Sequence, residues 1–427
     1  MIGTVGQLTK QASGAARLAK SAWKLGTGVV TSRFAEVRVK DAYRPRESGS
    51  YIAAVYFQSG MDSVYQLEQW LWPMEQLSRH LGENALEIFV RDPQVAEHIS
   101  RLTSLPVRFS RLTKGLDEFM SAPSLRLVFY VNQATGNFQG LRFPSPAHVH
   151  LSHGESEKIS MVSNQLKAYD GVFTAGEAAR VRIRRRLIGM SDDRMFDVGR
   201  PSLDRPRVVP DEWRRFLTSA DATATTQEGP VVFYAPTWEG DSDAMAYGSL
   251  AMNGEAIVCG LLGAGYRVLF RPHPRTGVLQ PAFRAAVEHV KTILDEHPAG
   301  FVDTTSEVGW QFDAADIALV ELSSVAYDWL SVQKPLVMVE PHNPGAELLP
   351  GGLLDRCPTL GRDDDVAVGV VELIRRELAA GDSTRIAQLS NWYLGPTGPG
   401  DQVKRFISAS TSMIESRSAQ LAARDRL

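Results

Sequence analysis

Cysteine is nearly absent from this chain, in which only Cys259 and Cys357 occur among 427 residues. Two cysteines cannot form a disulfide framework, and these two lie far apart in the sequence, unlike the closely spaced pairs of a zinc site. We therefore expect two unpaired thiols in a reducing compartment.

Long apolar runs are missing too. No stretch reaches the roughly 18 to 20 apolar residues that cross a bilayer, and the first residues lack the apolar region and cleavage site of a secretory signal. The expectation is a cytoplasmic protein, either free or held peripherally at the inner face of the cell membrane.

An excess of positive charge is also lacking, because 46 basic residues stand against 49 acidic ones, for a net charge of −3. Nucleic-acid-binding domains are clearly basic, so no nucleic-acid partner is expected. The exception is residues 1–35, which contain no acid; on a helix, most of their basic residues fall beside an apolar face. This basic amphipathic segment (residues 1–40) either lies on an anionic membrane surface or packs on its own domain with its charges in water.

What is present is a regular alternation of short apolar runs and amphipathic stretches. Such alternation predicts an α/β protein with parallel sheets covered by helices on both faces. The expected strands are 51–57, 86–90, 125–131, 148–152, 171–174, 231–235, 266–270, 317–320 and 336–339. The expected helices are 64–81, 175–187, 250–262, 281–294, 325–330, 366–379 and 403–423.

The chain is too long for a single core, so two domains are expected. A polar, proline-containing stretch at 206–229 predicts a linker between two Rossmann-like, doubly wound domains at 41–205 and 230–394. A Gly/Pro-rich loop precedes a last helical segment, 395–427, which is expected to return to the first domain. Domains of this kind bind ligands at the carboxyl ends of their strands, here toward a central cleft.

Two loops that follow expected strands carry side chains suited to an anionic ligand. In "VVFYAPTWEGD" (231–241), Pro236 ends the strand and leaves Thr237 at its carboxyl end. In "YRVLFRPHPRTG" (266–277), Arg271 ends the strand and His273 stands between two prolines, which stiffen the loop. Fixed arginine and histidine side chains suit a pyrophosphate, although an incidental threonine and a structural histidine are the alternatives.

A third loop offers hydroxyl groups. In "ADIALVELSSVAYDWL" (315–330), Ser323 or Ser324 is expected to cap a short helix, where hydroxyl and N–H groups together suit an anion. An ordinary cap without ligand is the alternative. The loop has neither the P-loop pattern nor the dinucleotide-binding glycine pattern.

The fourth loop, "AHVHLSHGESEKIS" (147–160), contains three histidines. His148 and His150 alternate with apolar residues and are expected on one face of a strand, whereas His153 lies beyond its end, beside Gly154. The triplet could bind a metal, but no partner motif of further histidines or carboxylates accompanies it. His153 as a general base is favoured, because an imidazole accepts a proton near neutral pH.

Together these loops resemble the CDP-glycerol glycerophosphotransferase family, the primases and polymerases of teichoic-acid synthesis and related capsule polymerases. The matching motifs are, in order, "SHGESEK", "VGRPSLD", "YAPTWEG", "RPHP" and "ELSSVAYDWL", between about residues 147 and 340. The first 140 residues carry no matching motif. The resemblance implies a GT-B architecture, with a CDP-linked donor on the C-terminal domain and a polyol-phosphate or glycan acceptor, lipid-linked, on the N-terminal one.

The resemblance also implies roles for individual residues. His153 would be the general base, with Gly154 and Lys158 on the acceptor side. His273 and Arg271 would stabilise charge on the donor diphosphate, while the remaining donor-site positions would be Thr237, Glu321, Ser323, Ser324 and Asp328. Fixed cations would do the work of a metal ion, so neither metal nor cofactor is expected.

Some positions depart from the family pattern. Ser152 stands where the family usually has an aromatic residue, and Glu155 and Glu157 replace small or apolar residues. Glu321 replaces the usual aspartate. These departures leave donor and acceptor identity open. A GT-B glycosyltransferase or nucleotide-sugar epimerase, a histidine-metal hydrolase and a non-catalytic membrane-associated scaffold are the other hypotheses.

Overall fold

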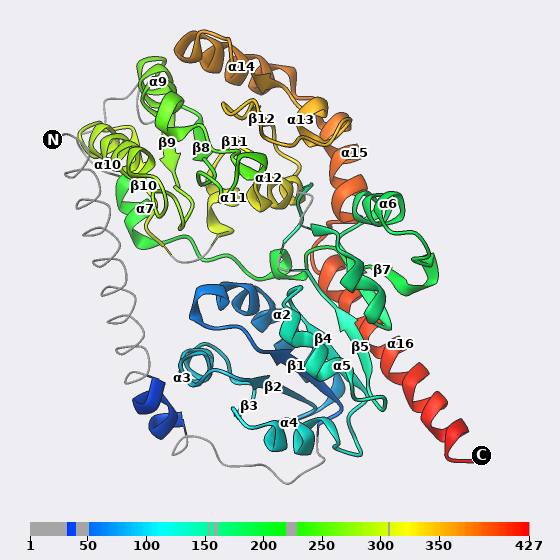
Figure 1. The fold of residues 1–427 in the computed structure, drawn as a ribbon. Coiled ribbons are helices and arrows are strands. Elements are labelled where there is room, and N and C mark those ends of the chain that lie inside the picture. The colour runs from blue at the N-terminus through cyan, green and yellow to red at the C-terminus, as the bar shows by residue number, and fades with distance from the viewer. Residues whose placement is uncertain are drawn as a thin grey trace, which may run out of the picture. The chain divides into compact units, whose positions relative to one another are not determined.

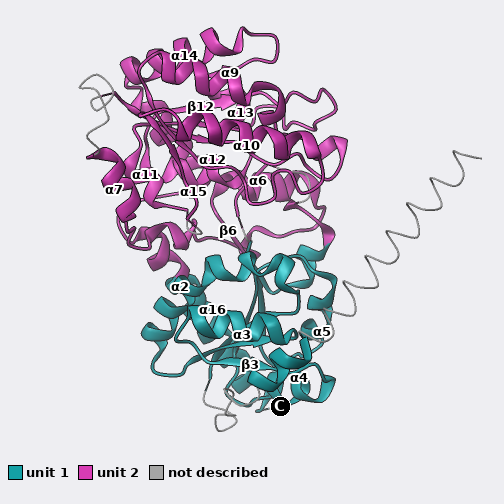
Figure 2. Cartoon of the chain, turned by 90° about the vertical axis from the view of Figure 1, so that its left-hand side faces the viewer, with its two compact units in different colours: residues 1–153, 165–172, 407–427 teal, residues 154–164, 173–406 magenta. Residues whose placement is uncertain are grey.

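The computed structural model describes residues 32–39, 51–152, 154–157, 161–218, 229–305 and 308–426. These residues form two compact units, coloured separately in Figure 2. Unit 1 takes the described residues up to 152, residues 165–172 and those from 407 onward, and unit 2 takes the remainder. Each unit contains a parallel sheet with helices (Figure 1). The predicted α/β class with two doubly wound sheets is therefore confirmed.

Unit 1 is built around a sheet with the strand order β3-β2-β1-β4-β5-β6, to which β7 adds beyond β6. Neighbouring strands from β3 to β6 run parallel, with Val55 opposite both Ile88 and Phe129. The unit boundary falls within β6. The strands are β1 (Ala53–Phe57), β2 (Leu86–Val90), β3 (Val107–Phe109), β4 (Leu127–Tyr130), β5 (Ala147–His150), β6 (Gly171–Thr174) and β7 (Met195–Asp197).

The helices of unit 1 cover this sheet and include the end of the chain. They are α2 (Tyr65–Leu81), α3 (Pro93–Leu102), α4 (Thr113–Met120), α5 (Phe138–Leu141) and most of α16 (Asp401–Arg424). In unit 1, Arg417 of α16 forms an ion pair of 2.9 Å with Asp170 and donates a hydrogen bond to the Pro144 carbonyl. The C-terminal segment thus packs on the same unit as the first strands.

Unit 2 has a six-stranded parallel sheet in the order β10-β9-β8-β11-β12-β13. Its strands are β8 (Val231–Ala235), β9 (Arg267–Phe270), β10 (Gly300–Val302), β11 (Ile317–Val320), β12 (Leu336–Val339) and β13 (Thr359–Leu360). Its helices are α6 (Glu177–Arg186), α7 (Asp211–Leu217), α9 (Leu250–Gly263), α10 (Pro281–Asp295), α11 (Trp310–Ala314), α12 (Ser324–Trp329), α13 (Leu353–Arg356), α14 (Val366–Ala380) and α15 (Ser383–Leu394).

The core of unit 2 has two layers because successive side chains of a strand point to opposite faces. Phe233 lies in the layer that includes α11, α12 and α15, whereas its neighbours Val232 and Tyr234 lie in the layer of α9, α10 and α14. A sheet covered on both faces has apolar side chains in both directions, which explains why β8 reads as a continuous apolar run.

Most of the expected elements are confirmed, with ends shifted by a few residues. The sequence analysis missed the helices α3, α4, α5, α11, α13 and α15 and the short strands β3, β7, β10 and β13. It also placed a linker at 206–229, of which residues 211–217 form α7. Of the basic N-terminal segment, residues 1–31 and 40 lie outside the described residues. Residues 32–39 are helical, and their Arg38 pairs with Glu97 at 2.7 Å.

No helix among the described residues has the length and apolar character needed to cross a membrane.

Candidate active site

The strand order of unit 2 defines where a ligand would bind. Strands β8, β9 and β10 follow one another toward one edge, while β11, β12 and β13 extend in the other direction, so the order reverses between β8 and β11. In open α/β sheets, ligands bind at the carboxyl ends of the strands beside this switch point. The loops after β8 and β11 carry Thr237 and Ser323, which the sequence analysis had selected.

A buried carboxylate joins these two loops. Glu321, directly after β11, accepts a hydrogen bond of 2.8 Å from the Thr237 amide and another of 2.8 Å from the Ser249 amide. The Ser249 hydroxyl donates a third bond, of 2.5 Å. Burial raises the pKa of Glu321 to about 7, against the lowering effect of these donors. Glu321 thus fixes the backbone at Thr237 and Ser249.

The Thr237 side chain is a different case. Thr237 is almost fully buried, and its hydroxyl has no hydrogen-bond partner within the described part of the chain. Buried polar groups are usually satisfied. A hydroxyl that is buried without a protein partner at the end of β8 is suited to contact a ligand.

Arg271 lies at the carboxyl end of β9, as expected, but it is held by an acid. Its guanidinium pairs with Asp303 at 2.5 Å and donates to the carbonyl oxygen of Thr305 at 3.0 Å. Gln311 donates a further bond of 2.6 Å to Asp303. Arg271 and Asp303 are both buried. The pair fixes the guanidinium orientation, and removing one member of such a buried pair costs about 3–5 kcal/mol.

His273 follows on the same loop and stacks on Trp238 of the β8 loop. The two ring centroids are 6.3 Å apart, with 24° between the planes. The imidazole Nδ1 accepts a hydrogen bond of 3.1 Å from the Arg275 amide, which in the neutral tautomer puts the proton on Nε2. The Arg275 guanidinium lies 3.8 Å from the centroid of the Trp238 ring. His273 is thereby oriented by both neighbours.

Glu239 connects the same two loops through backbone donors. Its carboxylate accepts hydrogen bonds from the amides of Gly277 (2.8 Å), Leu279 (2.8 Å) and Gln280 (3.0 Å), just before α10 begins. Burial alone would raise the pKa of Glu239, but these backbone donors outweigh it and the pKa is lowered. The charged carboxylate therefore holds the His273 loop against the β8 loop.

The third predicted loop lies against the segment that begins at Gly154. A β-carbon added to Gly154 would be 3.2 Å from the Ser324 Cβ, so the Gly154 backbone packs closely on the Ser324 side chain. Ser323 is buried and precedes α12. Among the described residues, its side chain caps none of the N–H groups of that helix. Glycine is thus the residue that suits position 154, since a larger side chain would displace Ser324.

Asp328, in the same short helix, pairs with Arg200. The distances from Arg200 Nε and Nη2 to the carboxylate are 2.9 and 3.3 Å. Both side chains are buried. Arg200 belongs to "VGRPSLD", so the second and fifth motifs of the resemblance meet in this ion pair. The carboxylate of Asp328 is therefore bound by the guanidinium of Arg200.

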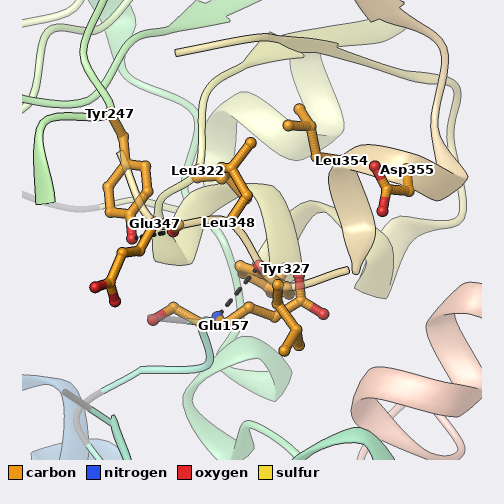
Figure 3. A pocket seen from close by; sticks show the side chains of 10 residues that line it. Glu157, Tyr247, Leu322, Tyr327, Glu347, Leu348, Leu354 and Asp355 are labelled. Carbon is orange, nitrogen blue, oxygen red and sulfur yellow. Dashed lines mark hydrogen bonds between the residues drawn. The ribbon is translucent and has the colours of Figure 1, made fainter. Parts of the chain in front are cut away.

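A small pocket opens at the same edge of the sheet (Figure 3). Its volume is about 20 Å³, enough for one water molecule. The hydroxyl of Tyr247 donates to the Glu347 carbonyl at 2.8 Å on one side of it. The lining includes Leu322, Tyr327, Glu157, Glu347 and Asp355. The pocket marks an opening beside the β11 loop.

Two histidines of "AHVHLSHGESEK" lie on a strand, as expected. His148 and His150 lie in β5 and are buried. In unit 1, the His148 Nδ1 is 2.9 Å from the Tyr130 hydroxyl and its Nε2 is 2.8 Å from the Phe143 carbonyl oxygen. Burial lowers the pKa of His148 and thus favours the neutral ring. His150 packs against the Tyr169 ring at 5.2 Å.

His153 and Lys158, the predicted base and its acceptor-side neighbour, lie outside the described residues. Unit 2 brings the other predicted positions to one sheet edge, through contacts between the β8 loop, the β9 loop and the start of α12. The sequence analysis did not identify the partners that hold them, namely Glu239, Asp303 and Arg200. Glu239 had a readable signal, because an acid directly after "APTW" follows the strand end.

The described residues contain no group of three or more histidine, cysteine or acidic side chains arranged to hold a metal ion.

Comparison with known proteins finds a family model that resembles part of the chain. Residues 148–343 match the model of the CDP-glycerol:poly(glycerophosphate) glycerophosphotransferase family. No curated protein matches the sequence. The matched range contains the loops after β8, β9 and β11 and most of strand β5.

Solved structures share the fold at low sequence identity. A putative UDP-N-acetylglucosamine 2-epimerase from Listeria monocytogenes superposes with a TM-score of 0.56 at 12% identity, covering 86% of this chain and 97% of its own. The wall teichoic acid polymerase TagF, in a variant soaked with CDPG, gives a TM-score of 0.53 at 12% identity, with coverage of 94% and 98%. TagF itself gives 0.51 at 13% identity, with coverage of 97% and 99%. These likenesses show the GT-B fold, and residues 148–343 are similar to the CDP-glycerol:poly(glycerophosphate) glycerophosphotransferase family.

Proposed function

We propose that this enzyme transfers glycerol phosphate, or a related polyol or sugar phosphate, from a CDP-linked donor to a hydroxyl group of a teichoic-acid or capsular acceptor, and releases CMP. The observation that carries the proposal is the close packing of Gly154 on Ser324. Gly154 directly follows His153 in the sequence, and its packing on Ser324 supports a shared role for the His-Gly and Ser-Ser motifs of the family. The acceptor we propose is lipid-linked, which would bring the enzyme to the membrane surface.

In the proposed reaction, His153 removes the proton from the acceptor hydroxyl. The acceptor oxygen then forms a bond to the phosphorus that carries the glycerol, and the bond between this phosphorus and the oxygen of CMP breaks. The electron pair and the negative charge leave with CMP. Because positioning and charge neutralisation supply most of the catalysis in phosphoryl transfer, the protein needs a base and fixed cations.

We assign the charge neutralisation to His273 and Arg271. The stacking on Trp238 and the ion pair with Asp303 hold the two side chains in fixed orientations, and preorganised donors are the effective ones. The Thr237 hydroxyl, buried without a described protein partner, is the proposed donor contact at the end of β8. The hydroxyls of Ser323 and Ser324 complete the proposed phosphate site.

Glu321 and Asp328 have supporting roles in this proposal. Each carboxylate is saturated by protein partners, Glu321 by the amides of Thr237 and Ser249 and Asp328 by Arg200. A carboxylate would also repel donor phosphates. We therefore propose that both acids hold the loops in place instead of contacting the donor.

One alternative function has an observation in its favour. Proteins named UDP-N-acetylglucosamine 2-epimerase share the fold, one with a TM-score of 0.56. A nucleotide-sugar epimerase or glycosyltransferase would break a bond at the sugar carbon. A glycosyltransferase would then release a nucleoside diphosphate, whereas an epimerase would retain it in its nucleotide-sugar product.

The released nucleotide separates the two functions. Purified protein is incubated with a panel of CDP- and UDP-linked donors and a synthetic lipid-linked glycerol phosphate oligomer, and the nucleotide products are read by mass spectrometry. We expect CMP from a CDP-linked donor. Release of a nucleoside diphosphate, or interconversion of a nucleotide sugar, would favour the alternative.

A further inference from the structure

The two arginines of "RPHPR" (residues 271–275) have different surroundings within unit 2. Arg271 is buried, and its guanidinium is bound by Asp303 and by the carbonyl oxygen of Thr305. Arg275 is exposed. Among the residues that the structure describes, no acid forms an ion pair with Arg275 and no acceptor takes a hydrogen bond from its guanidinium. The arginine of this loop that remains available to a ligand is therefore Arg275.

An aromatic ring holds the Arg275 guanidinium in place. Its central carbon, Cζ, lies 3.8 Å from the centroid of the Trp238 ring, and Trp238 is buried. A guanidinium over an indole is attracted by the electrons of the ring. The ring has no oxygen to accept a hydrogen bond, so the contact leaves the N–H groups of Arg275 able to donate to an anion.

The backbone around Arg275 is fixed as well. The Arg275 amide donates a hydrogen bond of 3.1 Å to His273 Nδ1. Glu239, which directly follows Trp238, accepts one of 2.8 Å from the Gly277 amide. The β8 loop therefore contacts the guanidinium of Arg275 through one residue and holds the backbone beyond it through the next. An arginine held in this way loses little further freedom when it binds a ligand.

Other groups suited to a phosphate lie around the same indole. The rings of His273 and Trp238 are stacked with centroids 6.3 Å apart. Thr237, the residue before Trp238, has a buried hydroxyl for which the described residues offer no partner. An imidazole, a hydroxyl and the Arg275 guanidinium thus gather at the carboxyl ends of β8 and β9. Arginine is well suited to a phosphate, because its planar guanidinium donates two parallel hydrogen bonds.

We propose that Arg275 binds the diphosphate of the donor. The charge of Arg271 is already offset by its ion pair with Asp303, so Arg275 supplies the uncompensated positive charge of the loop. This inference deepens the proposed function and rests on it, since it takes a nucleoside diphosphate derivative as the donor. It adds to the site a residue that no motif of the family resemblance contains.

The test measures donor binding by the full-length protein. Arg275→Gln removes the positive charge and keeps much of the side-chain length, whereas Arg275→Lys keeps the charge and loses the planar guanidinium. The Kd of CDP-glycerol is determined by calorimetry. We expect Arg275→Gln to raise the Kd by about 10- to 30-fold, the scale for hydrogen bonds from a charged donor, and Arg275→Lys to raise it by about 3-fold.

The salt dependence separates the charge of Arg275 from its packing on Trp238. The titrations are run at low and at physiological ionic strength. An exposed charge is screened by salt, so the difference in Kd between wild type and Arg275→Gln should shrink as ionic strength rises. Arg185→Gln is the matched control, because it removes one positive charge from the exposed surface of α6 in unit 2. Its Kd should stay within about 2-fold of wild type under both conditions.

The outcomes distinguish this inference from the proposed function. Wild-type protein that binds no CDP-glycerol refutes the function itself. If wild type binds CDP-glycerol, three results refute the role of Arg275: an unchanged Kd in Arg275→Gln, an equal rise in Arg185→Gln, or a rise that is independent of salt. Should Arg275→Gln fail to fold, Arg275→Lys decides, since a raised Kd supports the role and a wild-type Kd contradicts it.

Discussion

The amide of Thr237 donates a hydrogen bond of 2.8 Å to the carboxylate of Glu321, across the point where the strand order of unit 2 reverses. Unit 1 has a corresponding connection between the loops after β1 and β4, where the Asn132 amide nitrogen donates to the Ser59 hydroxyl at 3.2 Å. In each unit, a polar side chain that follows β4 or β11 forms a hydrogen bond with the loop that follows β1 or β8, respectively. Of these two connections, the one in unit 2 contains an ionisable group, the carboxyl of Glu321.

The buried carboxyl of Glu321 predicts that the stability of the protein depends on pH. Burial raises the pKa of Glu321 to about 7, above its value in an unfolded chain. An acid with a raised folded-state pKa binds more protons folded than unfolded, so the free energy of unfolding falls as the pH rises from about 4.5 to about 7. This rise in pKa corresponds to about 3–4 kcal/mol.

Denaturant unfolding of wild type and Glu321→Gln between pH 4.5 and 8 measures this effect. A neutral glutamine cannot titrate, although it loses one acceptor for the Thr237 or Ser249 donors. We expect the variant to be the less stable protein at pH 4.5 and to gain relative to wild type as the pH rises. A stability difference that stays constant over this range would contradict the assignment.

The second prediction concerns the base. His153→Ala should reduce CMP release from CDP-glycerol by about 100-fold or more, in line with the loss of a general base, while CDP-glycerol binds with an unchanged Kd. Enzyme kinetics and calorimetry on the same preparation check both parts. His150→Ala is the comparison, since His150 packs on Tyr169 in unit 1 and should affect stability more than kcat. Near-wild-type turnover in His153→Ala would show that another group is the base.

The third prediction separates the donor-site residues. His273→Ala should lower kcat by about 10- to 1,000-fold, because it removes a fixed donor from the charge that develops on the leaving group. Ser323→Ala should mainly weaken CDP-glycerol binding, by about 5- to 10-fold for one hydrogen bond. Steady-state kinetics with varied CDP-glycerol resolve kcat from KM. Variants that keep wild-type values for both constants would remove these residues from the site.

The fourth prediction is structural. Glu239→Gln replaces a carboxylate that accepts three backbone hydrogen bonds by a side chain with one oxygen. We expect a loss of about 1–3 kcal/mol in the free energy of unfolding and faster amide hydrogen exchange at Gly277, Leu279 and Gln280. Glu255→Gln, on the exposed surface of α9, is the control and should change neither quantity. An unaltered exchange rate in Glu239→Gln would contradict the role of this carboxylate.

Much of the fold was predictable from local patterns. Buried parallel strands are apolar over their whole length, and β2, β6, β8, β11 and β12 were predicted with their observed bounds. The missed strands are too short for such a pattern: β3 and β10 have three residues and β13 has two. Helix α3 had a readable start, since Asp92 caps it and a proline follows.

The site was predictable to a smaller extent. Thr237, Arg271 and Ser323 could be placed because each follows an apolar strand. Their partners could not, because contacts such as Arg271 with Asp303 or Arg200 with Asp328 join residues far apart in the sequence. Sequence spacing carries no information on which acid meets which arginine. The hydrogen bond from the Tyr393 hydroxyl to Glu157 also joins residues far apart in the sequence, and Tyr393 lies on α15, a helix that was not predicted.

The central claim is that the phosphate leaves the donor together with the glycerol. CDP-glycerol labelled with radioactive phosphorus at the glycerol-bearing position tests it most directly, with separation of nucleotide and acceptor after reaction. We predict that the label moves to the acceptor and that the released CMP is unlabelled. Label in a released nucleoside diphosphate, with an acceptor that gains no phosphorus, would contradict the account.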